Sequence, residues 1–558
     1  MRYSVFTSKF TQLIFLPLAI ILLLTSTIIL TSAAETKPPE HPRHEDTNVI
    51  LISLQCLRPD HLGTYGYQRE TSKNIDKLAE SSVLFENAIA QANLTPVAQM
   101  SVLTSQYPRV NGMISFEVSK EMVTATTLPA VLKNYGYTTA ATHSSPEFFM
   151  RYDTKGNTVV NPGDIFSRGF DYYGRTRRGP GGGSIRKAPT EAFKWLQENH
   201  DKKFFLWIGS GVIHMPYGAT VPKKLQSMYD PPDYKPFWEQ LPIKAKNGPA
   251  KGSPAYDIFS RVYNNQFFWD FKPIHKLTDD DISYVNGRYD TGVYYTDLFI
   301  GQLLALLDSL DLTKKTMIVL HSIHGEDLGE GGRFFHYDVT DTVVKNALLV
   351  RFPDDRFKGK RIKEQVQGID IMPTVLEYLD IPLPHEAQGG SLLPLIKGVG
   401  PAPSEFAYID RMPWWEYTLS KWYLEFQKND QKAPFSAKEL AAIDQYLPTL
   451  QASFEQLGYP PGDIAIRNND WKLIIRKNIG LLNKLSWWSF ITAQKHDVIE
   501  TELYDLQKDP LEMHNIAAAH PERVKTLKEK LLVWDGSIER QKARYNQNDQ
   551  RLIIPYPE

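Results

Sequence analysis

Two stretches decide the fold: Leu51-Ile52-Ser53-Leu54-Gln55-Cys56-Leu57-Arg58-Pro59-Asp60 and Leu320-His321-Ser322-Ile323-His324-Gly325-Glu326. Each is an apolar run that ends abruptly in polar residues. Buried parallel strands have this pattern when they deliver side chains to a site at the carboxyl edge of a sheet. The two stretches therefore predict two buried strands of an α/β sheet whose ends meet at one site.

Strand and helix patterns alternate along the rest of the chain, as they do in α/β domains. We expect strands at 48–54, 138–142, 204–209 and 317–321, and helices at 72–82, 128–135, 190–198 and 281–310. After about residue 400 the pattern changes. A strand at 470–475 and an amphipathic final helix at 521–533 predict a smaller C-terminal α+β subdomain. The expected domains are 47–400 and 401–558.

The composition bounds the class of protein. The chain has 558 residues, of which 42% are hydrophobic and 23% are charged, as in a soluble globular protein. A net charge of −1 gives no electrostatic basis for binding nucleic acid. Cys56 is the only cysteine, so an internal disulfide is excluded.

The N-terminus has the pattern of an export signal. Arg2 and Lys9 precede an apolar run at 13–30, and small residues follow up to Ala34. We expect a signal peptide at 1–34, with a membrane anchor through 13–30 as the alternative. The polar, proline-containing segment 35–46 is then a linker. Both alternatives predict an exported protein, periplasmic or extracellular.

Six segments, taken in order, resemble motifs of the sulfatases, a branch of the alkaline phosphatase superfamily. These segments are 51–67, 101–108, 214–217, 322–336, 369–376 and 502–510. The resemblance implies an alkaline phosphatase-like, mostly parallel sheet flanked by helices. It also implies hydrolysis of sulfate or phosphate esters with a divalent cation such as Ca²⁺ or Mg²⁺.

The register of the segment at 101–108 places Thr95 at the nucleophile position of the family and Gln99 at the position of a substrate-binding Arg. Thr cannot be converted to the formylglycine of sulfatases, whereas phosphoryl-transferring relatives use a Thr hydroxyl directly. The resemblance thus implies Thr95 as a catalytic residue and Gln99 as a substrate-binding residue. The alternative for Thr95 is a helix N-cap, a position that Thr favours.

Four residues fall at metal-ligand positions of the family or directly beside one: Gln55, Cys56 (in place of an acidic or Thr neighbour), Ile323 and His324. Gln offers only a neutral amide and Ile cannot ligate, so about two negative charges that would face a dication are lost. We therefore expect a degenerate metal site that binds no hard cation tightly. Ca²⁺ or Mg²⁺ is the cofactor if the site functions, with Glu326, Asp327 or His61 as replacement ligands. His324 is otherwise a hydrogen-bonded structural residue.

Three further histidines are candidate site residues. The resemblance implies that His214 and His336 contact oxygens of the substrate, so both are candidate catalytic residues. A Lys and a His of some family members would fall near Ser144 and Pro146, where this chain has neither. His143 lies close to these positions, and we consider it part of a remodelled substrate pocket. The alternative for His143 is a strand-end residue on the surface.

Two functions from different classes follow. The first is a sulfatase-like pseudo-enzyme that binds an anionic ester, a sulfated ligand or a partner without turnover. The second is an active hydrolase or transferase of sulfuric or phosphoric esters that uses Thr95. An aromatic region at 408–490, which includes Trp414, Trp415 and Trp422, is either a docking surface for a protein partner or a local core.

Overall fold

The computed structural model describes most of one compact unit, Asp46–Glu558. The described residues are 46–114, 125–144, 151–152, 158–159, 163–175, 190–215, 217–218, 220–234, 278–411, 462–476 and 500–547. The expected signal segment and nearly all of the expected linker lie outside them, and so does most of the aromatic region at 408–490. None of the helices in the described ranges is long and apolar enough to cross a membrane.

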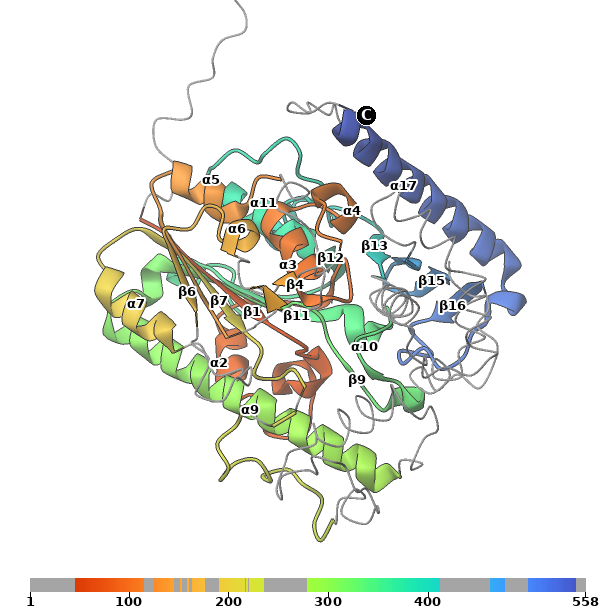
Figure 1. Ribbon diagram of the computed structural model, residues 1–558, viewed down its shortest axis with the longest axis horizontal. Helices are drawn as coiled ribbons and strands as arrows, with labels where there is room; N and C mark the ends of the chain where they lie inside the picture. The colour runs from red at the N-terminus through yellow and green to blue at the C-terminus, as the bar shows by residue number, and fades with distance from the viewer. Residues whose placement is uncertain are drawn as a thin grey trace, which may run out of the picture. The chain divides into compact units, whose positions relative to one another are not determined.

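An eight-stranded mixed sheet forms the centre of this unit (Figure 1). Across the sheet the order is β12 (Arg361–Gln367), β2 (Val83–Ile89), β11 (Lys345–Arg351), β8 (Thr316–Ser322), β1 (Asn48–Leu54), β7 (Phe204–Ser210), β3 (Thr138–His143) and β6 (Tyr172–Arg175). Only β11 runs antiparallel to its neighbours β2 and β8; the other pairs are parallel. The predicted α/β class with a mostly parallel sheet is confirmed.

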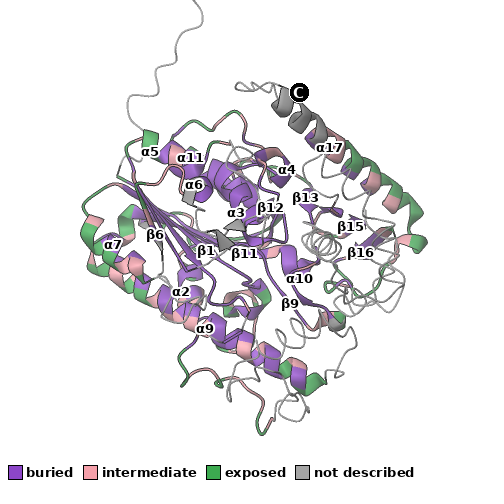
Figure 2. Ribbon diagram, viewed as in Figure 1, coloured by how far each residue is buried: buried purple, intermediate pink, exposed green. Residues whose placement is uncertain are grey.

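Helices cover both faces of the sheet (Figure 1). Alternate residues of β1 belong to different apolar clusters, because successive side chains of a strand point to opposite faces. One cluster includes side chains of α2 (Lys73–Glu80), α7 (Glu191–Asn199) and α9 (Asp279–Ser309). The other includes side chains of α3 (Thr95–Thr104), α5 (Leu128–Asn134), α6 (Gly163–Phe166), α11 (Ile371–Tyr378) and α12 (Leu393–Lys397). In Figure 2 the inner strands of the sheet are buried, whereas the edge strands β12 and β6 include exposed residues and α7 and α9 expose their outer sides.

The C-terminal part forms a second, antiparallel sheet. Its strands are β13 (Ala407–Asp410), β14 (Ile464–Arg467), β15 (Trp471–Ile475) and β16 (Thr501–Asp505), in that order. The final helix α17 (Pro521–Gln547) packs on it. This helix is longer than the predicted 521–533, because Trp534 and Ile538 continue the buried stripe at helical spacing.

Short elements complete the described chain. They include α4 (Pro108–Asn111), α10 (Asp341–Val344), two small hairpins and the 3-10 helices η1 (Pro59–His61), η2 (Gly63–Tyr65), η5 (Thr313–Lys315), η6 (Glu330–Gly332), η7 (Pro353–Asp355), η8 (Gly368–Asp370) and η9 (Ala517–Ala519). One hairpin pairs β4 (Arg151–Tyr152) with β5 (Thr158–Val159), and the other pairs β9 (Asp327–Leu328) with β10 (Phe334–Phe335). The second hairpin directly follows the end of β8 and therefore lies beside the carboxyl edge of the central sheet.

Candidate active site

The candidate site residues leave the central sheet at one edge. Gln55 and Cys56 follow β1, His214 follows β7, and His324 follows β8. Thr95 begins α3, a few residues after β2. These four strands run in the same direction, so their carboxyl ends lie at the same edge of the sheet.

Thr95 and His324 form a hydrogen-bonded pair. Thr95 Oγ1 lies 2.8 Å from His324 Nε2, and His324 Nδ1 lies 2.9 Å from the carbonyl oxygen of Gly325. A carbonyl only accepts, so Nδ1 carries the proton and the Thr95 hydroxyl donates to the lone pair of Nε2. Burial, assisted by the neighbouring His336, lowers the pKa of His324 to about 3, which keeps the imidazole neutral. This is the arrangement of a hydroxyl nucleophile with its general base.

The helix α3 does not use Thr95 as its cap. Leu94 occupies the N-cap position and makes no side-chain capping bond, and Thr95 is the first helical residue. Pro96 follows, where its missing N–H removes no helical hydrogen bond. The N-cap alternative for Thr95 is therefore wrong: the hydroxyl is directed to His324 instead.

A buried carboxylate, Glu326, organises the other side of the site. It accepts hydrogen bonds from the Tyr217 hydroxyl at 2.8 Å and from His336 Nδ1 at 3.0 Å, and the Cys56 thiol also bonds to it. Burial by itself raises the pKa of Glu326, but His336, together with His214 and the hydrogen bond from Cys56, outweighs it and lowers the pKa to about 2. Glu326 is therefore a fixed anion with no solvent exposure.

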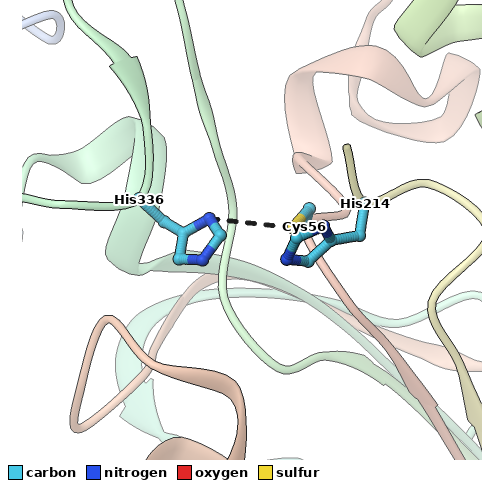
Figure 3. A group of neighbouring side chains, drawn as sticks. All are labelled: Cys56, His214 and His336. Carbon is cyan, nitrogen blue, oxygen red and sulfur yellow. Dashed lines mark hydrogen bonds between the residues drawn. The ribbon is translucent and has the colours of Figure 1, made fainter. Parts of the chain in front are cut away.

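Three imidazoles form a row that leads away from Thr95. The ring centroids of His324 and His336 are 4.4 Å apart, and those of His336 and His214 are 5.2 Å apart. Figure 3 shows His336 and Cys56 facing each other, with Cys56 Sγ 3.9 Å from His336 Nδ1 and His214 beside them. The structure thus brings four of the candidate residues, Thr95, His214, His324 and His336, into one connected group.

Cys56 has an unusual backbone conformation. Its φ angle is 57°, in the left-handed region that costs a non-glycine residue about 1 kcal/mol. The Tyr289 hydroxyl of α9 holds this turn, because it donates to the Cys56 carbonyl at 2.5 Å and accepts from the Arg58 N–H at 2.8 Å. Sequence reasoning considered Cys56 only as the replacement of an acidic or Thr residue and missed Tyr217 as a site residue, although Tyr217 closes the His214-Met215-Pro216-Tyr217 segment.

The two altered ligand positions do not fit a hard cation. Ile323 is 1% exposed and belongs to the same apolar cluster as Val97 and Val319, so it presents only hydrocarbon. Gln55 is fully buried and brings no charge. Ca²⁺ and Mg²⁺ prefer charged oxygen ligands, and these positions supply none.

Two of the expected replacement ligands are held elsewhere. His61 Nδ1 lies 2.6 Å from Asp290 Oδ1, and Asp327 accepts hydrogen bonds from the hydroxyls of Thr340 and Thr342. Burial raises the pKa of Asp327 to about 6, although Arg333 opposes this. Of the three expected replacement ligands, only Glu326 contacts the row of imidazoles.

The two residues expected to bind substrate are both buried. Gln99 lies within α3, and neither atom of its side-chain amide has a hydrogen-bond partner among the described residues. His143 ends β3 and packs edge-on against Trp207, with ring centroids 4.0 Å apart. Burial lowers the pKa of His143 to about 3, and only 1% of the residue is exposed. The alternative of a surface histidine is therefore wrong.

Comparisons with known proteins agree with this architecture. Residues 47–381 match the sulfatase family model. Human iduronate 2-sulfatase is 25% identical over 533 residues, covering 84% of this chain and 90% of the relative, and rat steryl-sulfatase is 25% identical over 454 residues, covering 68% and 76%. Among solved structures, a phosphonate monoester hydrolase of Agrobacterium radiobacter has a TM-score of 0.56 at 19% identity, covering 89% of this chain and 96% of the other. The family match spans more than half of the chain and the fold agrees, so this chain belongs to the sulfatase family.

Proposed function

We propose that this protein hydrolyses phosphate, phosphonate or sulfate monoesters, with Thr95 as the nucleophile and His324 as the base. One observation carries the proposal: the Thr95 hydroxyl donates to His324 Nε2 at 2.8 Å, while the opposite ring nitrogen is fixed by the Gly325 carbonyl. The imidazole is thus neutral and in the tautomer whose Nε2 lone pair can accept a proton from the hydroxyl, and its low pKa makes it a weak base before substrate binds.

The chemistry is a double displacement. Thr95 Oγ1 forms a bond to the phosphorus or sulfur atom of the ester as its proton passes to His324 Nε2. The bond between that atom and the leaving oxygen breaks, and the leaving alkoxide takes the proton from His324 Nε2 to become the alcohol. Water then displaces Thr95 from the covalent adduct, giving one equivalent of phosphate, phosphonate or sulfate and restoring the hydroxyl.

Two observations support binding of an anionic substrate. Thr95 lies at the N-terminus of the ten-residue helix α3, where the helix dipole favours negative charge. His336 and His214 continue the row from His324, where they can contact oxygens of the substrate. The phosphonate monoester hydrolase similarity supports phosphorus esters as the first substrates to test. No step is assigned to Ca²⁺ or Mg²⁺, because Gln55 and Ile323 do not fit them.

The test is a panel of aryl phosphates, phosphonates and sulfates with the full chain and three variants. Thr95→Val removes the hydroxyl with little change in shape, and Thr95→Ser keeps a hydroxyl. Thr104→Val is the matched control, because Thr104 is another buried hydroxyl of α3 and, among the described residues, bonds only within its own helix and to Asn111. We expect turnover in the wild type, Thr95→Ser and Thr104→Val but not in Thr95→Val. Equal turnover by Thr95→Val refutes the proposal.

A second candidate is a pseudo-enzyme that binds an anionic ester or sulfated ligand without turnover. The observation that favours it is Ile323, whose burial among apolar side chains leaves the family's metal position without a ligand. Saturable binding of an aryl sulfate or phosphate by wild type, measured by calorimetry, with no product from any ester of the panel, supports this candidate over the first.

We also propose export of the protein. The support is the order of features near the N-terminus: Arg2 and Lys9, an apolar run at 13–30, and small residues up to Ala34. N-terminal sequencing of the full-length product expressed in bacteria tests it. A start after Ala34 indicates a cleaved signal, an intact N-terminus in the membrane fraction indicates an anchor, and an intact cytosolic product contradicts export.

A further inference from the structure

A group of soft ligands lies beside the Thr95–His324 pair. The side chains of Cys56, His214 and His336 point toward one another, and one ligand atom from each lies within 4.8 Å of the others (Figure 3). They come from three separate loops, after β1, after β7 and after β10. We infer that these three residues form a binding site for a thiophilic divalent transition metal, with Zn²⁺ as the reference ion.

The spacing suits a tetrahedral ion. Ligand atoms around tetrahedral Zn²⁺ bound by Cys and His are about 3.6 Å apart, from Zn–S of ~2.3 Å and Zn–N of ~2.05 Å. The 3.9 Å between Cys56 Sγ and His336 Nδ1 is close to this value. The ligand atoms, which lie within 4.8 Å of one another, therefore need to move by only about 1 Å to surround an ion.

The protonation pattern also suits metal binding. His214 Nδ1 lies 2.7 Å from the Met215 carbonyl oxygen, so Nδ1 carries the proton and Nε2 keeps its lone pair for a ligand bond. The Glu326 carboxylate lies 3.0 Å from His336 Nδ1, so when Nδ1 gives up its proton to bind the ion, Glu326 lies where it can be a further ligand. The Cys56 thiolate and Glu326 together balance the charge of a dication.

The donor set distinguishes this site from the one that the family implies. Thiolate and imidazole select Zn²⁺, Co²⁺ or Cu, whereas Ca²⁺ and Mg²⁺ take carboxylate and carbonyl oxygens. Cys56 is fully buried, and His214 and His336 keep only 7% and 9% exposure, so the group lies below the surface and is shielded from bulk water. The inference does not require Thr95 to act as a nucleophile.

Cobalt absorption tests the site directly. The full chain, without a polyhistidine tag, is titrated with Co²⁺, whose bond to a thiolate gives a near-ultraviolet charge-transfer band and whose tetrahedral complexes absorb strongly in the visible. We expect one Co²⁺ per chain, displaced by Zn²⁺ and unaffected by excess Ca²⁺ or Mg²⁺. Saturation without a charge-transfer band, or no saturation, overturns the inference.

Four variants separate this site from general imidazole binding and from catalysis. Cys56→Ser should abolish the charge-transfer band, and His214→Ala should weaken Co²⁺ binding at least about tenfold. His200→Ala, at an exposed histidine of a distant helix end, and Thr95→Val should both bind Co²⁺ as the wild type does. A loss of Co²⁺ binding in His200→Ala as large as that in His214→Ala, or an unchanged absorption spectrum in Cys56→Ser, refutes the site. Circular dichroism verifies that each variant folds. If Cys56→Ser does not fold, the Co²⁺ affinity of His214→Ala is the result that tests the site.

Discussion

Replacing Asp370 with Asn should remove a loss of stability that the wild type suffers as the pH rises from about 4 to about 7. Asp370 is the last residue of η8 and precedes α11, and only 1% of it is exposed. Its carboxyl accepts hydrogen bonds from the N–H groups of Gln367 at 2.8 Å and Gly390 at 3.0 Å. Burial raises the pKa of Asp370 from 3.8 to about 7, and the two hydrogen bonds oppose this shift only partly.

The size of the effect follows from that shift. The unfolded chain releases the Asp370 proton near pH 4, whereas the folded protein holds it until about pH 7, so the free energy of unfolding falls as pH rises between these values. At 1.36 kcal/mol per pKa unit, the loss is about 2 kcal/mol at pH 5 and about 4 kcal/mol at pH 8. An Asn side chain cannot ionise and avoids this loss.

The assay is urea unfolding of wild type and Asp370→Asn at pH 5 and pH 8. The stability of the variant relative to wild type should rise by about 2.5 kcal/mol from pH 5 to pH 8. Asp308→Asn is the control, because Asp308 is exposed on α9 and its replacement should give the same small difference at both pH values. A pH-independent difference between Asp370→Asn and wild type would refute the reasoning.

Three further substitutions test the packing that supports the site. Asp290→Asn should lower the free energy of unfolding by about 3–5 kcal/mol in urea titrations, because the buried carboxylate binds three donors; a loss near zero contradicts this. Tyr289→Phe should cost about 2–3 kcal/mol in the same assay, since it strips two hydrogen bonds from the Cys56 turn, and an unchanged urea midpoint speaks against that role. Gly389→Ala should lower the melting temperature, since a new Cβ would lie 2.1 Å from the Ile369 carbonyl oxygen; an unaltered melting curve excludes that clash.

Much of the central sheet could be predicted from the sequence. The strand at 48–54 matches β1 residue for residue, because a parallel strand buried on both faces is apolar throughout and ends where polar residues begin. The long helix predicted at 281–310 begins two residues earlier, at Asp279, because Thr278 and Asp281 form a capping box. Helix ends depend on such local bonds, which the spacing of apolar residues does not reveal.

The candidate site was less accessible to sequence reasoning. The family register identified Thr95, but its partner His324 is 229 positions away, so only the fold reveals their hydrogen bond. Cys56 was considered only as a replacement for an acidic ligand. Its proximity to His214 and His336 depends on three loops meeting at one edge of the sheet. The spacing of apolar residues in the sequence does not predict that these three loops lie together.

The covalent adduct on Thr95 is the most direct measure of the proposed chemistry. The full chain is mixed with an excess of an aryl phosphate, phosphonate or sulfate, quenched in acid, digested and analysed by mass spectrometry. We expect the peptide that contains Thr95 to gain the mass of one phosphoryl, phosphonyl or sulfuryl group, and the corresponding peptide of Thr95→Val to remain unmodified. Turnover of the ester by Thr95→Val, or an adduct on a different residue of the wild type, would contradict the account.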